Sequence, residues 1–74
     1  MTATLTFNLP EDENEFRLAC NGGKWMSAMY DLDQHLRGLL KYDESITGET
    51  YDALDKVRDK LYEILNENSL SFNE

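Results

Sequence analysis

Residues 24–41, KWMSAMYDLDQHLRGLLK, decide the expected fold of this chain. Apolar residues recur in this stretch every three or four positions, a spacing that places them along one side of an α-helix. Asp33 and Arg37 lie four residues apart, so we expect them to pair on a solvent-exposed side of the helix. A chain of 74 residues has room for one core, and we expect the other segments to pack on this helix. The apolar residues are Trp25, Met29, Leu32, Leu36, Leu39 and Leu40.

Length and charge restrict the classes of function. Fifteen of the 74 residues are acidic and seven are basic, which gives a formal net charge of −8. A surface with this charge repels nucleic acids and anionic lipids, and it attracts basic protein surfaces. We therefore expect no direct contact with nucleic acid or membrane. The competing explanation is that the acidic charge serves solubility alone.

Cysteine content and apolar runs restrict the setting. Cys20 is the only cysteine, which excludes an internal disulfide and favours a reducing compartment. One Cys and one His are too few for a structural zinc site, and we expect no metal or cofactor. No apolar run approaches the roughly 20 residues that cross a bilayer, and residues 1–9 do not resemble a signal peptide. Oligomerisation is the expected additional source of stability for so small a core.

The N-terminal quarter predicts a strand followed by a short helix. Residues 2–9, TATLTFNL, alternate between polar and apolar side chains, which is typical of a strand with one buried side. Pro10 ends the strand and suits the first turn of a helix. We expect this helix to run from about Pro10 to Cys20, because Gly22 and Gly23 follow and favour helix termination.

The remaining chain predicts two further helices and a second strand. The central helix is expected from about Lys24 to Tyr42, residues 43–48 form a loop, and a third helix runs from about Glu49 to Asn66. The tail, residues 69–74, alternates again and is expected to pair with residues 2–9. The predicted architecture is therefore α+β and mostly helical, a single domain over residues 1–74 with the order β-α-α-α-β.

A row of acidic residues on the third helix is the first candidate binding site. Its members repeat about every four residues, roughly 6 Å apart along the helix axis, which approximates the spacing of phosphates in a nucleic-acid strand. The row is therefore expected to imitate a nucleic acid toward a protein that binds one. The alternative is an ordinary solvated face with local salt bridges. The four-residue repeat consists of Asp55, Asp59, Glu63 and Glu67, and Asp52 lies on the same side of the helix. We name Asp52, Asp55, Asp59 and Glu63 the acidic row and expect it to bind the partner.

Met26 and Tyr30 are the second candidate site. They lie about one turn apart on the central helix and are rotated away from its main apolar stripe. Met and Tyr are enriched at protein interfaces, so an exposed pair would mark a partner site or a dimer seam. The alternative is that they pack beneath the first helix or the terminal strands.

Catalytic chemistry has little support in the sequence. Asp31 and His35 are spaced for a carboxylate–imidazole pair, but general acid–base catalysis also needs a third group and a pocket. Gly22–Gly23 follows a helix instead of a strand, so it does not match a phosphate-binding loop. We expect no enzymatic activity.

Three segments carry a resemblance to a known group of proteins. They are FNLPEDENEF (residues 7–16), WMSAMYDLDQHLRGLLKY (residues 25–42) and YDALDKVRDKLYEIL (residues 51–65). In these segments the chain resembles small acidic accessory proteins encoded by tailed bacteriophages. The resemblance implies a protein that works in the cytoplasm of a bacterial host, and it assigns no functional residue.

Two hypotheses about function follow. The first is a protein that binds a bacterial host or defence enzyme with a basic surface and inhibits or redirects it, through nucleic-acid mimicry where the target binds nucleic acid. The second is a homo-oligomeric structural or assembly factor, with the central helix as its apolar seam. Strong salt dependence of partner binding would favour the first, and concentration-dependent self-association would favour the second.

Overall fold

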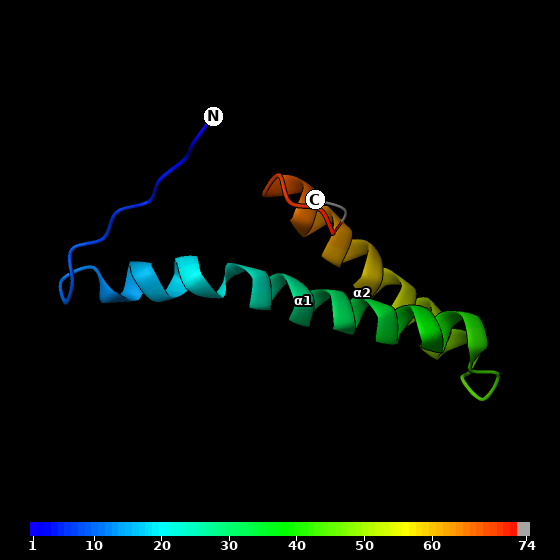
Figure 1. Ribbon diagram of the computed structural model, residues 1–74. Coiled ribbons are helices and arrows are strands. Elements are labelled where there is room, and N and C mark those ends of the chain that lie inside the picture. Colours follow the sequence, from blue (N-terminus) through cyan, green and yellow to red (C-terminus); the bar gives the residue numbers. More distant parts are fainter. Residues whose placement is uncertain (73–74) are drawn as a thin grey trace.

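Two helices make up the regular structure of residues 1–72, the part of the chain that the computed structural model describes. Helix α1 spans Glu13–Tyr42, helix α2 spans Gly48–Glu67, and residues 43–47 connect them (Figure 1). No strand is present in residues 1–72. The expected β-α-α-α-β fold is therefore wrong, and the chain forms an antiparallel pair of helices.

Helix α1 replaces two of the predicted helices. Gly22 and Gly23 were expected to end the first one, but no glycine in the described residues adopts a positive φ angle. Each glycine costs about 1 kcal/mol relative to alanine inside a helix, which is too little to interrupt a long amphipathic segment. Leu18 and Trp25 flank the pair and lie on the same side of α1 because they are seven residues apart. The helix therefore runs through both glycines without a break.

The N-terminal segment has no regular structure. Residues 1–8 do not form the predicted strand, and residues 9–12 form a turn before α1 begins at Glu13. The Asn8 amide donates to a carboxylate oxygen of Asp12 at 3.0 Å, and the Asp12 amide donates to the Asn8 carbonyl at 2.7 Å. The rings of Phe7 and Phe16 meet edge to face with centroids 5.6 Å apart. These contacts hold residues 7–12 against the first turn of α1.

Helix α2 lies within one residue, at each end, of the helix expected over residues 49–66. Thr47 caps its start, since the Thr47 hydroxyl accepts a hydrogen bond from the Thr50 amide at 3.2 Å. At its end, Ser69 adopts a φ of 56° and the Leu70 amide donates to the Leu65 carbonyl at 2.8 Å. A hydrogen bond between residues five apart, with a left-handed residue just before the donor, is typical of the Schellman motif, which reverses the chain after a helix.

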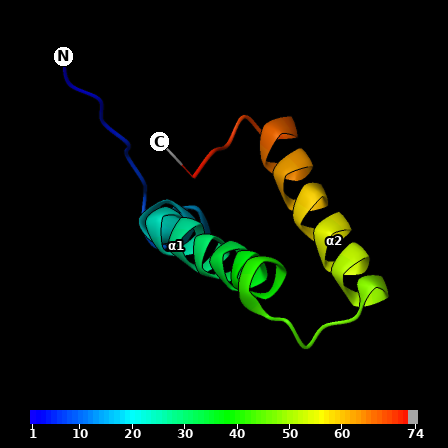
Figure 2. The same cartoon turned by 90° about the vertical axis from the view of Figure 1, so that its right-hand side faces the viewer.

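The C-terminal tail therefore turns back toward the helices and does not pair with the N-terminus. The Phe72 ring contacts the rings of Tyr30 and Tyr62, with centroids 5.5 and 6.0 Å away. The predicted second strand is wrong for residues 69–72, and residues 73–74 of that prediction lie outside the described residues. In Figure 2 the tail crosses from the end of α2 toward α1.

The packed region between the helices is small. Among residues 1–72, Leu36 is the only buried apolar residue, at 6% exposure, and Asp33 is the only buried polar one, at 1%. The helices diverge from the connecting loop (Figures 1 and 2), and the N-terminal part of α1 projects beyond the end of α2 (Figure 1). The radius of gyration is 17.3 Å, whereas a compact domain of this length has one of about 11 Å. Much of the apolar surface is consequently uncovered.

Candidate protein-binding surfaces

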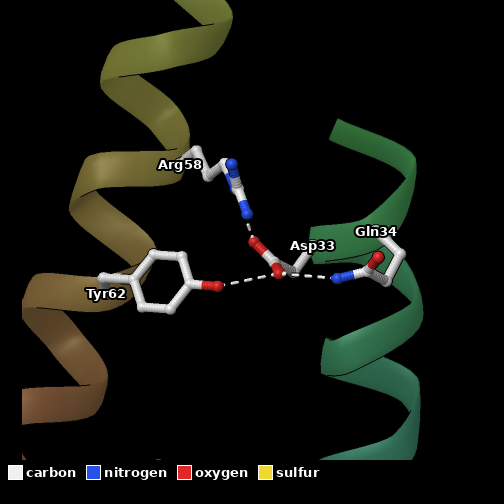
Figure 3. Close-up of polar contacts among 4 residues, drawn as sticks. All are labelled: Asp33, Gln34, Arg58 and Tyr62. Atoms are coloured by element: carbon white, nitrogen blue, oxygen red, sulfur yellow. Dashed lines mark hydrogen bonds and ion pairs between the residues drawn. The ribbon is translucent and has the colours of Figure 1, made fainter. Parts of the chain in front are cut away.

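A polar cluster centred on Asp33 joins the two helices (Figure 3). One Asp33 carboxylate oxygen accepts from the Arg58 Nε at 2.8 Å. The other accepts from the Tyr62 hydroxyl at 2.8 Å and from the Gln34 Nε2 at 3.3 Å. The Arg58 guanidinium also lies 5.6 Å from the centroid of the Tyr62 ring. Both carboxylate oxygens are thus engaged, and the carboxylate links α1 to α2.

The charges of this cluster are mutually stabilised. Burial raises the pKa of the Asp33 carboxyl, but the hydrogen bonds from Arg58 and Tyr62 and the Arg58 charge outweigh it, so the pKa lies below its ordinary value. The hydrogen bond to Asp33 raises the pKa of the Arg58 guanidinium. Burial, followed by the hydrogen bond to Asp33, raises the pKa of the Tyr62 hydroxyl. Asp33 therefore stays ionised and Tyr62 stays protonated at neutral pH.

The sequence prediction for Asp33 was wrong. It placed Asp33 on the solvent-exposed side of the helix, with Arg37 as its partner. In the structure the Asp33 side chain is buried, and its ionic partner is Arg58 on α2. A signal for this was present: Asp33 lies four residues after Met29 and three before Leu36, in the middle of the apolar stripe. An acidic residue in that position requires a cationic partner across the interface.

Met26 and Tyr30 lie beside the C-terminal tail. The Tyr30 ring contacts Phe72, and Met26 and Phe72 line the same shallow pocket. Both side chains remain partly exposed, which leaves part of their surface free for a partner. The tail covers these residues in part, whereas the cover expected from a separate first helix or from terminal strands is not formed within residues 1–72.

The acidic row lies on the solvent-exposed side of α2. All four of its residues are exposed: Asp52, Asp55, Asp59 and Glu63. Within residues 1–72 the only ion pair in the row joins Glu63 to Lys60 at 3.3 Å. Within the same residues, Lys56 forms no ion pair with Asp52 and Lys60 forms none with Asp59, so the local salt bridges of the alternative interpretation are formed only in part. Three carboxylates of the row therefore have no ion-pair partner among residues 1–72.

A largely uncovered apolar surface lies beside the contact between the two helices. The hydrogen bonds from Asp33 to Arg58 and Tyr62 define one face of the helix pair. With about 100° of rotation per residue, the exposed apolar residues lie about 60–100° from Asp33 on α1 and about 100–120° from Arg58 on α2, on the same side of the helix pair. Trp25, the only tryptophan, is 63% exposed and borders the pocket that Phe72 of the tail also lines. We call this surface the apolar face; its members are Leu18, Trp25, Leu32, Val57 and Ile64.

Further properties can be stated for the described residues. Within residues 1–72, no three His, Cys, Asp or Glu side chains are grouped so that they could hold a metal ion. In that same part of the chain, neither helix is long and apolar enough to cross a membrane. No family model, curated protein or solved structure matches this chain. The resemblance to phage accessory proteins therefore stays a prediction.

Proposed function

We propose that this chain is a non-catalytic binding protein whose acidic row attaches to a basic surface of another protein and inhibits or redirects that protein. The observation that supports this most directly is the lack of neutralisation along the row. Asp52, Asp55 and Asp59 are exposed and have no ion pair within residues 1–72. Charge arranged on one side of a small protein accelerates association with an oppositely charged surface and selects against other partners.

The proposed partner is a bacterial host or defence enzyme that binds nucleic acid. The acidic row extends about 16 Å along α2, with its members about one turn apart, so it can occupy a groove built for successive phosphates. The resemblance to phage proteins is in keeping with a bacterial target and with action in the host cytoplasm. Met26 and Tyr30 would add apolar and aromatic contacts at the border of such an interface.

The experiment is capture of partners from a bacterial host by the tagged chain at low and at high salt. We expect one stoichiometric protein that is retained at low salt and released at high salt, because contacts between exposed charges are screened. The test variant carries Asp55→Lys, Asp59→Lys and Glu63→Lys, which changes the formal net charge from −8 to −2. Loss of the captured protein in this variant would support the proposal.

A matched control separates the position of the charge from its amount. The control carries Glu11→Lys, Glu15→Lys and Glu44→Lys, three exposed acidic residues outside the row, and has the same net charge of −2. We expect it to retain the partner. Equal loss in both variants, or retention in both, would contradict a role for the row.

A homo-oligomeric structural or assembly factor is the second candidate function. The uncovered apolar face favours it, since monomeric proteins seldom leave contiguous apolar surface exposed. Under this alternative the host yields no captured protein and the acidic row acts only in solubility.

A further inference from the structure

The apolar side of α1 follows a seven-residue repeat. Its positions are separated alternately by four and three residues over three heptads, which is the period of a helix that winds around another helix. None of these positions carries a charged or polar side chain. In order they are Leu18, Gly22, Trp25, Met29, Leu32, Leu36 and Leu39.

Helix α2 covers only one of the two rows that make up this repeat. Leu36 is buried and Met29 is half-buried, and both belong to the row that faces α2 and the tail. Leu18, Trp25 and Leu32 belong to the other row, and all three are exposed, Leu18 at 65%. In a coiled coil both rows pack against a neighbouring helix. Leu39, the last member of this row, is half-buried near the connecting loop, so the row lacks a partner over residues 18–32.

The surface area indicates how much is left uncovered. The chain exposes 6356 Å², whereas a folded monomer of 8.6 kDa exposes about 4,700 Å². The excess is about 1,700 Å² per chain, and the extended N-terminal residues contribute part of it. Two chains that each bury an area of this order reach the 2,000–5,000 Å² typical of obligate homodimers. A chain that buries one apolar residue within residues 1–72 needs such burial for a stable core.

Charge does not oppose association of two copies through this face, despite the net charge of −8. The helix positions that border the repeat on α1 are uncharged, apart from Asp33, which is buried against Arg58. The acidic row of α2 points away from the apolar face, so two copies would keep their acidic rows on the outside. The bordering residues are Ala19, Asn21, Met26, Ala28, His35 and Leu40.

We propose that the occupant of the apolar face is a second copy of this chain, in antiparallel orientation. Helix α1 has 30 residues and α2 has 20, which correspond to lengths of about 45 and 30 Å. The N-terminal part of α1 therefore projects beyond α2 (Figure 1). A two-fold axis perpendicular to α1 near its middle places this projecting part against α2 of the other copy. The result is a four-helix bundle in which both rows of the repeat are covered.

The unmodified protein provides the first test, by sedimentation equilibrium together with fluorescence of the single tryptophan. We expect a mass of twice 8.6 kDa at micromolar concentration, with blue-shifted Trp25 emission that acrylamide quenches poorly. Dilution should lower the mass and shift the emission to the red together. A monomer that is helical at 100 μM, or an assembly of three or more copies, would overturn the proposal.

Two matched variants locate the seam. Leu32→Glu places a charge on the apolar face, and we expect it to weaken dimerisation at least 100-fold. Ser27→Glu adds the same charge to the other side of α1, where Ser27 is exposed, and we expect no change in the dimer dissociation constant. Equal effects of the two variants would contradict this seam. If Leu32→Glu fails to fold, the mass and emission of the unmodified protein still decide the question.

Spin labels test the orientation. In a Cys20→Ser background, labels at Asp31→Cys should lie close together across the dimer, whereas labels at Glu15→Cys should lie far apart. Equal short distances at both sites would indicate parallel helices and overturn the antiparallel arrangement. The mass, the tryptophan emission and the spin-label distances are all measured on the purified chain alone. Absence of dimerisation can therefore be told apart from absence of partner binding by the acidic row.

Discussion

Replacing Asp33 by asparagine tests the assignment of the polar cluster as the main link between the helices. The substitution preserves the size and shape of the side chain and removes its charge. The asparagine oxygen can accept from Arg58 or from Tyr62, but its amide nitrogen is a donor and faces donors. One of the two 2.8 Å hydrogen bonds is therefore lost, and the other is no longer charge-assisted.

The magnitude follows from these losses. A hydrogen bond with a charged partner contributes about 1.5–3 kcal/mol, and an unpaired buried group carries its desolvation cost in addition. The desolvation cost is reduced because the Arg58 side chain is 25% exposed, so water can partly solvate its guanidinium after the carboxylate is removed. We expect Asp33→Asn to lower the free energy of unfolding by about 2 kcal/mol. For a chain of this size that corresponds to a melting temperature lower by about 10 °C.

Urea unfolding followed by circular dichroism at 222 nm measures this change, with all proteins at one concentration because association contributes to stability. Asp31→Asn is the control: it removes the same charge two residues away, at an exposed position, and should change the free energy by less than about 0.5 kcal/mol. The double variant Asp33→Leu, Arg58→Leu should be more stable than either single one, since no charge is left buried alone. If Asp33→Asn behaves like Asp31→Asn, the cluster does not hold the helices together.

Four further outcomes follow from the structure. Folding lowers the pKa of Asp33, so its contribution to the free energy of unfolding is present above the ordinary pKa of 3.8 and is lost as the pH falls through the lowered value. The difference in unfolding free energy between the native chain and Asp33→Asn, measured with urea, should therefore shrink below pH 4. Thr47→Ala removes the cap on the Thr50 amide and should cost about 1 kcal/mol in the same assay. Ser69→Gly should raise the melting temperature, because glycine adopts the φ of 56° without strain. Phe72→Ala removes two edge-to-face ring contacts and should cost about 1–3 kcal/mol, measured by chemical denaturation; no loss would show that the tail is not packed.

The sequence predicted the helices better than their ends. The three- and four-residue apolar spacing located α2 almost completely and the C-terminal half of α1. The break at Gly22–Gly23 was wrong because local helix-ending tendency was weighed above the apolar stripe that continues on both sides. The intrinsic cost of two glycines, about 2 kcal/mol, is small beside the interactions of a 30-residue helix.

The terminal strands and the polar cluster depend on contacts that alternation along the chain does not reveal. Residues 2–9 have the pattern of a strand, but a strand exists only with a hydrogen-bonded neighbour. The tail was assigned as that neighbour, and the reversal at Ser69 sends it to the tyrosines instead. The partner of Asp33 is 25 residues away in the chain, and i,i+4 spacing favoured the nearer Arg37. The outward position of the acidic row did follow from the sequence, because it depends on helical periodicity alone.

The buried carboxylate also fixes how far α2 can slide along α1. A shift by one helical turn, about 5.4 Å, would still bring apolar residues together, since leucines recur at that interval in residues 32–40 of α1 and 61–65 of α2. The same shift would place Asp33 opposite Leu54 or Tyr62 and would bring Arg58 to Arg37 or Met29. In both directions an ionised group would lose its counter-charge inside the interface, at a cost of several kcal/mol. Apolar packing between leucines is compatible with several registers of the two helices. The buried carboxylate of Asp33 selects one of them.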